Sequence, residues 1–225
     1  AMGLEFSKPH TDERSQLLYC SVGSFQTEVS PYEFIVPPTT AILIPAGTPH
    51  SGRASQIVKY RSLYICSRTY PSLPQETIAI NVSPLLKELI LKACQFPWDY
   101  TDSSAASRMA DVIIDEIITA PKEMFALPMT NNDSLRAIKA FIIQNLSEKM
   151  TAEALAKRFA ISGKTLSRLC KKELGMTFET WRQQIKLIKA IELLSLKRST
   201  TDVAQALGYN ADSAFIYQFK KLTGK

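Results

Sequence analysis

The sequence predicts a multi-domain α+β protein, in which an N-terminal antiparallel β-barrel with appended helices precedes an all-α C-terminal domain. Three observations predict this. Short strand-like runs broken by glycine and proline occupy residues 15–65, and helical periodicity occupies most of the chain after Pro74. A basic helical run at 166–175 is matched by a second run at 215–224, offset by 49 positions. The net charge also changes sign between the two parts.

The charge of the chain is concentrated in its C-terminal part. From Asn131 onward there are 17 Lys and Arg residues against 8 Asp and Glu, whereas the preceding part has 10 against 13. The basic excess therefore belongs entirely to the C-terminal part. This asymmetry predicts a polyanion-binding module joined to a part that does not bind polyanions.

The predicted strands are short and end at turn residues such as Gly23, Pro37 and Pro45. Five are expected, at residues 16–22, 24–29, 34–36, 41–44 and 57–65. Strands of this length and punctuation are typical of a compact antiparallel sandwich or barrel.

Two helices are predicted after the strands. Ser83 caps a helix that begins at Pro84, and residues 104–120 carry Met109, Val112, Ile113 and Ile117 along one side. Such helices either cover the open edge of a barrel or make a dimer contact, and both uses bury the same kind of stripe. Trp98, which lies between them, is expected to pack.

A linker is predicted at residues 121–133, where Pro128 and Asn131-Asn132-Asp133 break the helical pattern and the charge changes. It separates a domain at 8–120 from a domain at 134–225. The second domain is predicted to consist of helices at 134–147, 152–159, 163–174, 178–196, 200–207 and 211–222. Thr151 and either Thr200 or Thr201 are the expected caps of the two short helices, and Gly175 closes the helix before it.

Each copy of the repeat predicts a helix with one apolar and one polar face. In the first copy the apolar face has Leu166, Leu169, Cys170 and Leu174, and the polar face has Lys164, Ser167, Arg168 and Lys171. In the second copy Phe215, Phe219 and Leu222 take the apolar face, while Ser213, Ile216, Tyr217 and Lys220 take the other. A short helix, a turn of three or four residues and such a helix form the helix-turn-helix plan.

This plan suits double-stranded DNA. The start of the second helix of a unit can enter the major groove, where Lys164, Ser167 or Arg168 would meet base edges. Phosphate contacts are expected from helix starts and basic residues, namely Thr151, Lys171, Lys172, Thr200, Thr201, Lys220 and Lys221. The helix at 178–196 is a stiff spacer that would place the two reading helices about one DNA turn, roughly 34 Å, apart.

Residues 134–224 resemble the DNA-binding domain of AraC-type (AraC/XylS) transcription regulators. The resemblance rests on residues 164–169 (Lys-Thr-Leu-Ser-Arg-Leu), 181–184, 190–194 and 203–209, followed by Ser213-Ala214-Phe215. It implies base contacts from Lys164, Ser167 and Arg168 in the first unit and from Asp212, Ser213 and Tyr217 in the second. Asp212 is acidic for a groove contact, so it either accepts from a cytosine amino group or only caps its helix.

The N-terminal part resembles the cupin sensor domain of the same family, through residues 36–51 and the strand at 61–65. The resemblance implies a small-molecule effector and a homodimer formed through this domain. His50, Tyr60 and Arg61 are the candidate effector-pocket residues, although Tyr60 and Arg61 equally well flank the barrel rim.

No metal site or cofactor is predicted. His50 occupies a position where cupins often place a metal ligand, but the residues two before and two after it are Thr48 and Gly52, and His10 is a weak partner. The four cysteines are interpreted as buried or partly buried free thiols of a reducing cytoplasm.

The function predicted from these features is that of a cytoplasmic, bacterial, sequence-specific transcription regulator, an activator or a repressor, and not an enzyme. Its partners would be DNA and an effector, and no run of apolar residues is long enough for a membrane. Two alternatives are a cupin metalloenzyme with an accessory basic domain and a protein that binds DNA without sequence choice.

Overall fold

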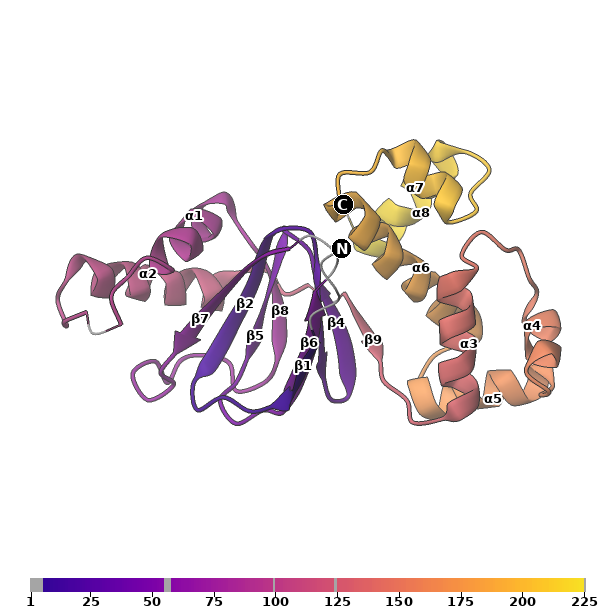
Figure 1. The fold of residues 1–225 in the computed structure, drawn as a ribbon, viewed down its shortest axis with the longest axis horizontal. Coiled ribbons are helices and arrows are strands. Elements are labelled where there is room, and N and C mark those ends of the chain that lie inside the picture. The colour runs from indigo at the N-terminus through magenta and orange to yellow at the C-terminus, as the bar shows by residue number, and fades with distance from the viewer. Residues whose placement is uncertain (1–5, 55–57, 99, 124, 225) are drawn as a thin grey trace. The chain divides into compact units, whose positions relative to one another are not determined.

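The computed structural model describes residues 6–54, 58–98, 100–123 and 125–224, and the chain forms two compact units, Ala1–Phe125 and Ala126–Lys225 (Figure 1). The division falls inside the stretch predicted as a linker. Residues at its start are held by the first unit, since the Asn81 amide donates to the carbonyl of Pro121 and the Glu123 amide to that of Ala79. The predicted mixed α+β fold is confirmed.

The first unit contains two antiparallel sheets (Figure 1). One has the order β7-β2-β5-β8, and the other includes β1-β6-β3-β4. Their bounds are β1 Phe6–His10, β2 Ser15–Val22, β3 Phe25–Val29, β4 Tyr32–Val36, β5 Thr40–Ile44, β6 His50–Ala54, β7 Lys59–Ile65 and β8 Ile78–Asn81. Alternate residues of β2 and β5 face the second sheet, and the others face a layer of helices.

Three strands of this unit, β1, β6 and β8, were not predicted. β6 reads His-Ser-Gly-Arg-Ala and has no apolar alternation, and β1 contains Pro9, so neither carries the usual strand pattern. Backbone pairing to their neighbours forms them instead, with β6 lying between β1 and β3. Gly52 permits this packing, because a Cβ atom there would lie 2.3 Å from Cζ of Phe25. The predicted start of the fifth strand, Ile57, lies outside the described residues.

Helices α1 (Pro84–Ala93) and α2 (Ala105–Thr119) cover the outer face of the β7-β2-β5-β8 sheet (Figure 1). The sheet and the helices share one apolar core, which includes Leu17, Leu43, Ile90 and Ile117. Of the two uses predicted for these helices, covering the sheet is therefore observed. Their caps are Ser83, as predicted, and Ser104.

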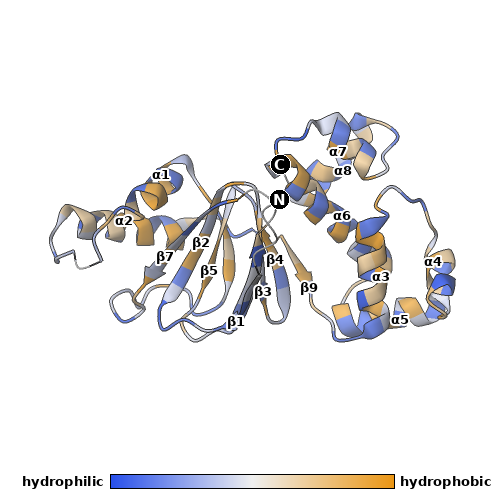
Figure 2. Cartoon of the chain, viewed as in Figure 1, coloured by the Kyte–Doolittle hydropathy of each residue, from blue (hydrophilic) through white to orange (hydrophobic). Residues whose placement is uncertain are grey.

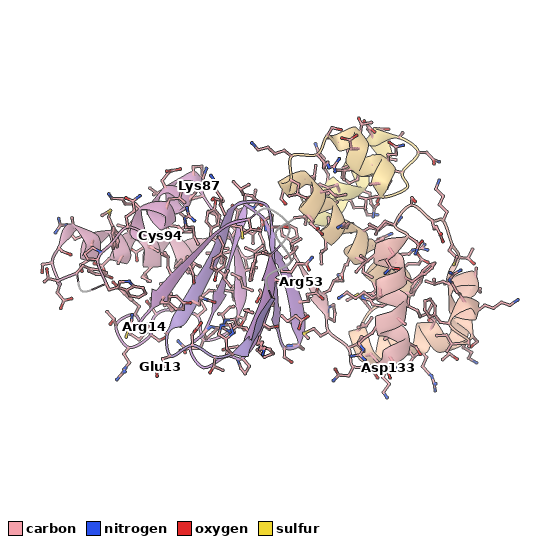
Figure 3. All side chains as sticks on the ribbon, in the orientation of Figure 1. Glu13, Arg14, Arg53, Lys87, Cys94 and Asp133 are labelled. Carbon is pink, nitrogen blue, oxygen red and sulfur yellow. The ribbon has the colours of Figure 1, made fainter. Side chains whose placement is uncertain are left out.

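Two predictions of burial in this layer were wrong. Val112 is 43 % exposed because the buried stripe of α2 runs through Ile113, Ile114 and Ile117. Trp98 is 84 % exposed, because it lies after α1 ends and beyond the reach of the core. Cys94 follows α1 directly and is also exposed, which corrects its interpretation as a buried or partly buried thiol (Figure 3).

The second unit begins with the short strand β9 (Ala126–Pro128) and is otherwise helical. Its helices are α3 Asp133–Gln144, α4 Ala152–Arg158, α5 Gly163–Leu174, α6 Phe178–Ser195, α7 Thr200–Ala206 and α8 Asp212–Thr223. All contribute to one core, with Trp181 of α6 fully buried in it. Hydrophobic and hydrophilic residues lie on different parts of α3 and α5 (Figure 2), which is the amphipathic pattern expected of helices that cover a core.

The predicted cap Thr151 and the predicted helix end at Gly175 are observed, whereas the predicted cap of α7 is not. Thr151, Ser162 and Thr177 accept from the third residue after each of them, and Gly175 ends α5 in the left-handed region at φ 71°. The cap of α7 is Ser199, whose Oγ accepts from the Asp202 amide, so the prediction of Thr200 or Thr201 as the cap was wrong. Both threonines lie in the first turn, and Ser199-x-x-Asp202 is a pattern that marks a helix start.

Candidate nucleic-acid interface and ligand cavity

The first helix-turn-helix consists of α4, residues 159–162 and α5. Leu166, Cys170 and Leu174 fix α5 to the core, because their side chains are buried on one face. The opposite face carries the side chains predicted to contact DNA, and all of them are exposed: Lys164, Ser167, Arg168, Lys171 and Lys172. A shallow groove follows this face and is lined by those five residues together with Ser162 and Thr165.

The polar face of α5 is strongly cationic. Its described carboxylate neighbour is Glu173, which lies 3.7 Å from Nζ of Lys172 in an exposed pair. Such a pair holds its partner only weakly, so Lys172 stays available to a polyanion. The other three cations, Lys164, Arg168 and Lys171, form no ion pair with any of the described residues.

The second helix-turn-helix consists of α7, residues 207–211 and α8. The stretch between α7 and α8 is one residue longer than the stretch between α4 and α5. The longer turn places Gly208 at φ 78°, where a Cβ atom would meet the Ser147 carbonyl oxygen at 2.6 Å. In the turn of the first helix-turn-helix, Ala160 takes the left-handed region instead, at φ 55°.

The outer face of α8 is less charged than that of α5. Ser213, Ile216, Tyr217 and Lys220 are exposed as predicted, with Tyr217 at 69 %. Phe215 is buried, but Leu222 is 36 % exposed in the last turn of α8, so its prediction as a core residue was wrong. The remaining predicted phosphate contacts, Lys221 here and Thr151, Thr200 and Thr201 at the helix starts, are exposed.

Asp212 does not cap its helix. The cap position of α8 is Ala211, which has no side chain able to accept the free amides. One carboxylate oxygen of Asp212 instead accepts a 2.5 Å hydrogen bond from Oγ1 of Thr201. The structure thus joins two of the predicted DNA-contacting residues to each other and excludes the capping alternative.

Helix α6 holds both helix-turn-helix units through charged side chains. The Arg182 guanidinium donates to the carbonyl of Met150, just before α4, at 2.6 Å, and Nζ of Lys186 donates to the carbonyl of Leu207, where α7 ends, at 2.7 Å. Burial, with Arg182 and Lys149 nearby, lowers the pKa of Lys186. Sequence reasoning found the spacer but missed these two anchors, since a cation on a helix resembles any solvated residue.

The first unit contains a cavity of about 380 Å³. It is lined by residues of both sheets, namely Ser7, His10, Gln16, Leu18, Phe25, Thr27, His50, Ser51, Gly52, Ala54, Val58, Tyr60 and Tyr64. Two of the three predicted pocket residues, His50 and Tyr60, are therefore present. Arg61 is not, because it follows Tyr60 on β7 and points to the other face of the sheet, where its guanidinium bonds the Tyr60 carbonyl.

The cavity wall offers several polar groups to a ligand. Nε2 of Gln16 donates to the Tyr64 hydroxyl at 3.1 Å, while its Oε1 is buried without a hydrogen-bond partner among the described residues. Tyr60 packs against Phe25 with ring centroids 5.3 Å apart, and desolvation raises the pKa of its phenol, which is therefore neutral at pH 7. Gln16 and Tyr64 were missed because nothing in an alternating strand marks which face lines a cavity.

His10, Asp12 and His50 come together at this cavity. The pairing of β1 with β6 places His10 opposite His50, and Oδ2 of Asp12 lies 3.6 Å from Nε2 of His50. His10, which was predicted to be a weak partner, lies beside His50, because the β1–β6 pairing closes the 40-residue separation between them. The sequence has no second metal ligand two residues from His50. The other two candidate ligands come instead from the unpredicted strand β1 and from Asp12, just after it.

Both units of the chain match known protein families. Residues 1–123 match the family described as AraC-like ligand binding domain, and residues 155–225 match a helix-turn-helix domain. The chain is 30 % identical over 222 residues to the HTH-type transcriptional regulator NimR of Escherichia coli, covering 98 % of this chain and 81 % of NimR. It is 26 % identical to the HTH-type transcriptional activator RhaS of Salmonella schwarzengrund, covering 55 % of this chain and 45 % of RhaS.

Among solved structures, the C-terminal domain of the response regulator AraT from Geobacillus stearothermophilus is 31 % identical, with a TM-score of 0.39. That alignment covers 42 % of this chain and 79 % of the AraT domain. No helix in the described part of the chain has the length and apolar character that crossing a membrane requires.

Proposed function

The chain belongs to the AraC family of transcription regulators, and from this premise we propose which residues read DNA and what controls them. It is a sequence-specific DNA-binding regulator with a helix-turn-helix domain and an N-terminal ligand-binding domain. In our proposal α5 and α8 each enter the major groove, so that one chain reads two successive segments on one side of the duplex. The observation that carries this is the exposed cationic face of α5.

The first reading helix is α5. Lys164, Ser167 and Arg168 face solvent along its outer side, with Lys164 in the first turn and the other two one turn further along. Arg168 is the principal base contact, because a guanidinium bonds both O6 and N7 of guanine. Lys171 and Lys172, in the last turn, bind phosphates and supply affinity without sequence content.

The second reading helix is α8, with Asp212, Ser213 and Tyr217 toward the bases. Asp212 is held by Thr201, so its carboxylate is pre-oriented and favours a donor such as the cytosine amino group. Lys220 and Lys221 contact phosphates, as do Thr151, Thr200 and Thr201 at the starts of α4 and α7.

Helix α6 sets the distance between the two reading helices. Its 18 residues span about 27 Å at 1.5 Å per residue. Arg182 donates to the Met150 carbonyl before α4, and Lys186 donates to the Leu207 carbonyl after α7. These hydrogen bonds hold the two helix-turn-helix units at fixed positions on α6. A separation of about one DNA turn, roughly 34 Å, is the one that such a spacer supports.

A small-molecule effector binds in the N-terminal cavity and alters DNA affinity. The cavity volume of about 380 Å³ suits a small organic molecule, and the unpartnered Oε1 of Gln16 requires a donor from it. A homodimer forms through the first unit, which exposes Leu85, Val112 and Ile118 on α1 and α2. The regulator acts in the cytoplasm, where its DNA is.

Replacing one residue of each kind separates base reading from phosphate binding. Arg168→Ala is expected to weaken binding to the preferred duplex by about 1–3 kcal/mol and to leave binding to random duplex nearly unchanged. Lys220→Ala is expected to weaken both duplexes alike and to lower the slope of log K against log salt by about 1. Fluorescence anisotropy titrations at several salt concentrations measure both effects.

The same titrations discriminate the alternatives. Wild-type protein that binds its selected duplex no tighter than random duplex at physiological salt would be a DNA-compacting protein and not a regulator. Equal losses on both duplexes for Arg168→Ala would remove Arg168 from base reading. Lys171→Ala is the matched control in the first helix-turn-helix. Lys171 occupies the position of Lys220 in the repeat, so this variant should behave as Lys220→Ala does.

A further inference from the structure

Three potential metal ligands lie together at the cavity of the first unit. His10 and His50 are directly opposite each other on β1 and β6, with ring centroids 4.4 Å apart and planes tilted by 54°. Asp12 follows β1, and one ligand atom from each of the three residues lies within 4.8 Å of the others. His50 is buried, Asp12 is half-buried and His10 is exposed, so the cluster spans the cavity wall from inside to outside.

Each imidazole has one ring nitrogen beside a backbone carbonyl. Nδ1 of His10 lies 2.8 Å from the Lys8 carbonyl, and Nδ1 of His50 lies 3.0 Å from the Thr48 carbonyl. A carbonyl can only accept, so each Nδ1 is the donor in its hydrogen bond, and Nε2 is the ring nitrogen left to bind a metal ion. Backbone carbonyls commonly orient ligating histidines in this way.

The carboxylate of Asp12 has one oxygen that forms no hydrogen bond with the described residues. Oδ2 of Asp12 is buried and has no hydrogen-bond partner among the described residues. Its distance of 3.6 Å from Nε2 of His50 is too long for a hydrogen bond. An ion pair with His50 would account for these two residues but not for His10, whose ring centroid lies 4.4 Å from that of His50.

We propose that His10, Asp12 and His50 bind one divalent transition-metal ion of the Zn²⁺ class. Two imidazole nitrogens and a carboxylate oxygen suit Zn²⁺, Co²⁺, Ni²⁺ or Fe²⁺, and three protein ligands leave at least one coordination position open. Bonds of about 2.0–2.2 Å put neighbouring ligand atoms about 3.3 Å apart. Closing the cluster to that size requires the exposed His10 side chain to move toward Asp12 and His50.

The open position of the ion is reached from the cavity. His10 and His50 both line it, and the unpartnered Oε1 of Gln16 belongs to the same wall. An anionic or hydroxylated molecule in the cavity would therefore be able to complete the coordination sphere. The metal site itself does not depend on DNA reading, so its test is independent of the proposed function.

Metal titration of the tag-free full chain tests this site. With Co²⁺ as the probe, one equivalent is expected to give visible d–d absorption without the near-ultraviolet band of a cobalt–thiolate bond, and Zn²⁺ is expected to displace it. His10→Ala and Asp12→Asn should each weaken Co²⁺ binding at least 10-fold. These two replacements are preferred to His50→Ala, because His50 is buried and its loss risks unfolding the unit.

Two controls make the result decisive. Asp102→Asn, an exposed carboxylate outside the cluster, and Cys66→Ser should bind Co²⁺ as the wild type does. No binding by the wild type would overturn the proposal and leave a structural His50–Asp12 pair. Binding that His10→Ala and Asp12→Asn leave unchanged would overturn it equally. Circular dichroism of each variant without metal excludes unfolding as the cause of a loss.

Discussion

At the scale of single residues, the thiols of the chain differ in reactivity as well as in burial. Hydrogen bonds from the Thr69 side chain and from the backbone amides of Thr69 and Arg68 lower the pKa of the Cys66 thiol to about 7. Burial raises the pKa of Cys20 to about 12 and that of Cys170 to about 11. Desolvation also raises the pKa of Cys94, although its side chain is exposed.

Iodoacetamide labelling is therefore expected to select Cys66. About half of this thiol is ionised at pH 7, and the thiolate is the nucleophile, so its labelling should rise about tenfold from pH 6 to pH 8 and then level off. Cys94 is the matched comparison, because it is accessible but protonated. Peptide mass spectrometry of partly labelled protein measures both rates, and equal labelling of Cys66 and Cys94 at pH 7 would contradict the assignment.

The positions of some single residues could be predicted from the sequence, and those of others could not. Lys164, Ser167 and Arg168 could be placed on an exposed face because helical spacing fixes which side chains share a side. Of the two positions predicted for Arg61, pocket or rim, the pocket is excluded; the sequence could not decide between them because a strand pattern does not tell which of its two faces is the interior. Asp212 needed the position of Thr201, a contact that only the turn between α7 and α8 creates.

At the scale of elements, the two helix-turn-helix units are copies with different turns. Their reading helices end alike, at Gly175 with φ 71° and at Gly224 with φ 73°. Their turns differ, since Gly208 must lie against the backbone of Ser147, whereas Ala160 is exposed and takes the same left-handed region at a steric cost. The glycine is required in one copy and dispensable in the other.

Opposite substitutions at these two positions should have opposite effects. Gly208→Ala is expected to lower the free energy of unfolding of the Ala126–Lys225 unit by about 2–4 kcal/mol, since it adds backbone strain and a clash with Ser147. Ala160→Gly should change stability by less than about 1 kcal/mol, toward greater stability, because relief of strain offsets the added chain entropy.

Urea unfolding followed by tryptophan emission reports this unit alone. Trp181 is fully buried in its core, while Trp98 of the first unit is already 84 % exposed and changes little on unfolding. A loss for Ala160→Gly as large as that for Gly208→Ala would contradict the difference between the two turns.

Elements with a regular apolar period were predictable, and those held by pairing were not. The helices from α3 to α8 begin and end within a few residues of their predicted bounds, because caps and 3.6-residue spacing are written locally. Strands β1 and β6 carry polar, glycine- and proline-containing sequences and exist through hydrogen bonds to distant strands. The cluster of His10, Asp12 and His50 was missed for that reason alone.

At the scale of the whole molecule, two units of different charge divide the work of the regulator. The basic excess belongs to the part with the two reading helices, and the cavity belongs to the other part. Within the DNA-binding unit the charge is again uneven, since α5 presents Lys164, Arg168, Lys171 and Lys172, whereas α8 presents Tyr217 and Ile216 beside its two lysines. We expect the first reading helix to contribute more affinity and the second to tolerate more sequences.

In our proposal, one chain reads two DNA segments with two helices. The test is selection of bound duplexes from a random pool, carried out with the wild type, Arg168→Ala and Tyr217→Ala. We predict a site with two sequence blocks centred about 10–10.5 base pairs apart. Arg168→Ala should erase preference in one block and Tyr217→Ala in the other. A site with a single block, or equal loss from both blocks in each variant, would contradict the claim.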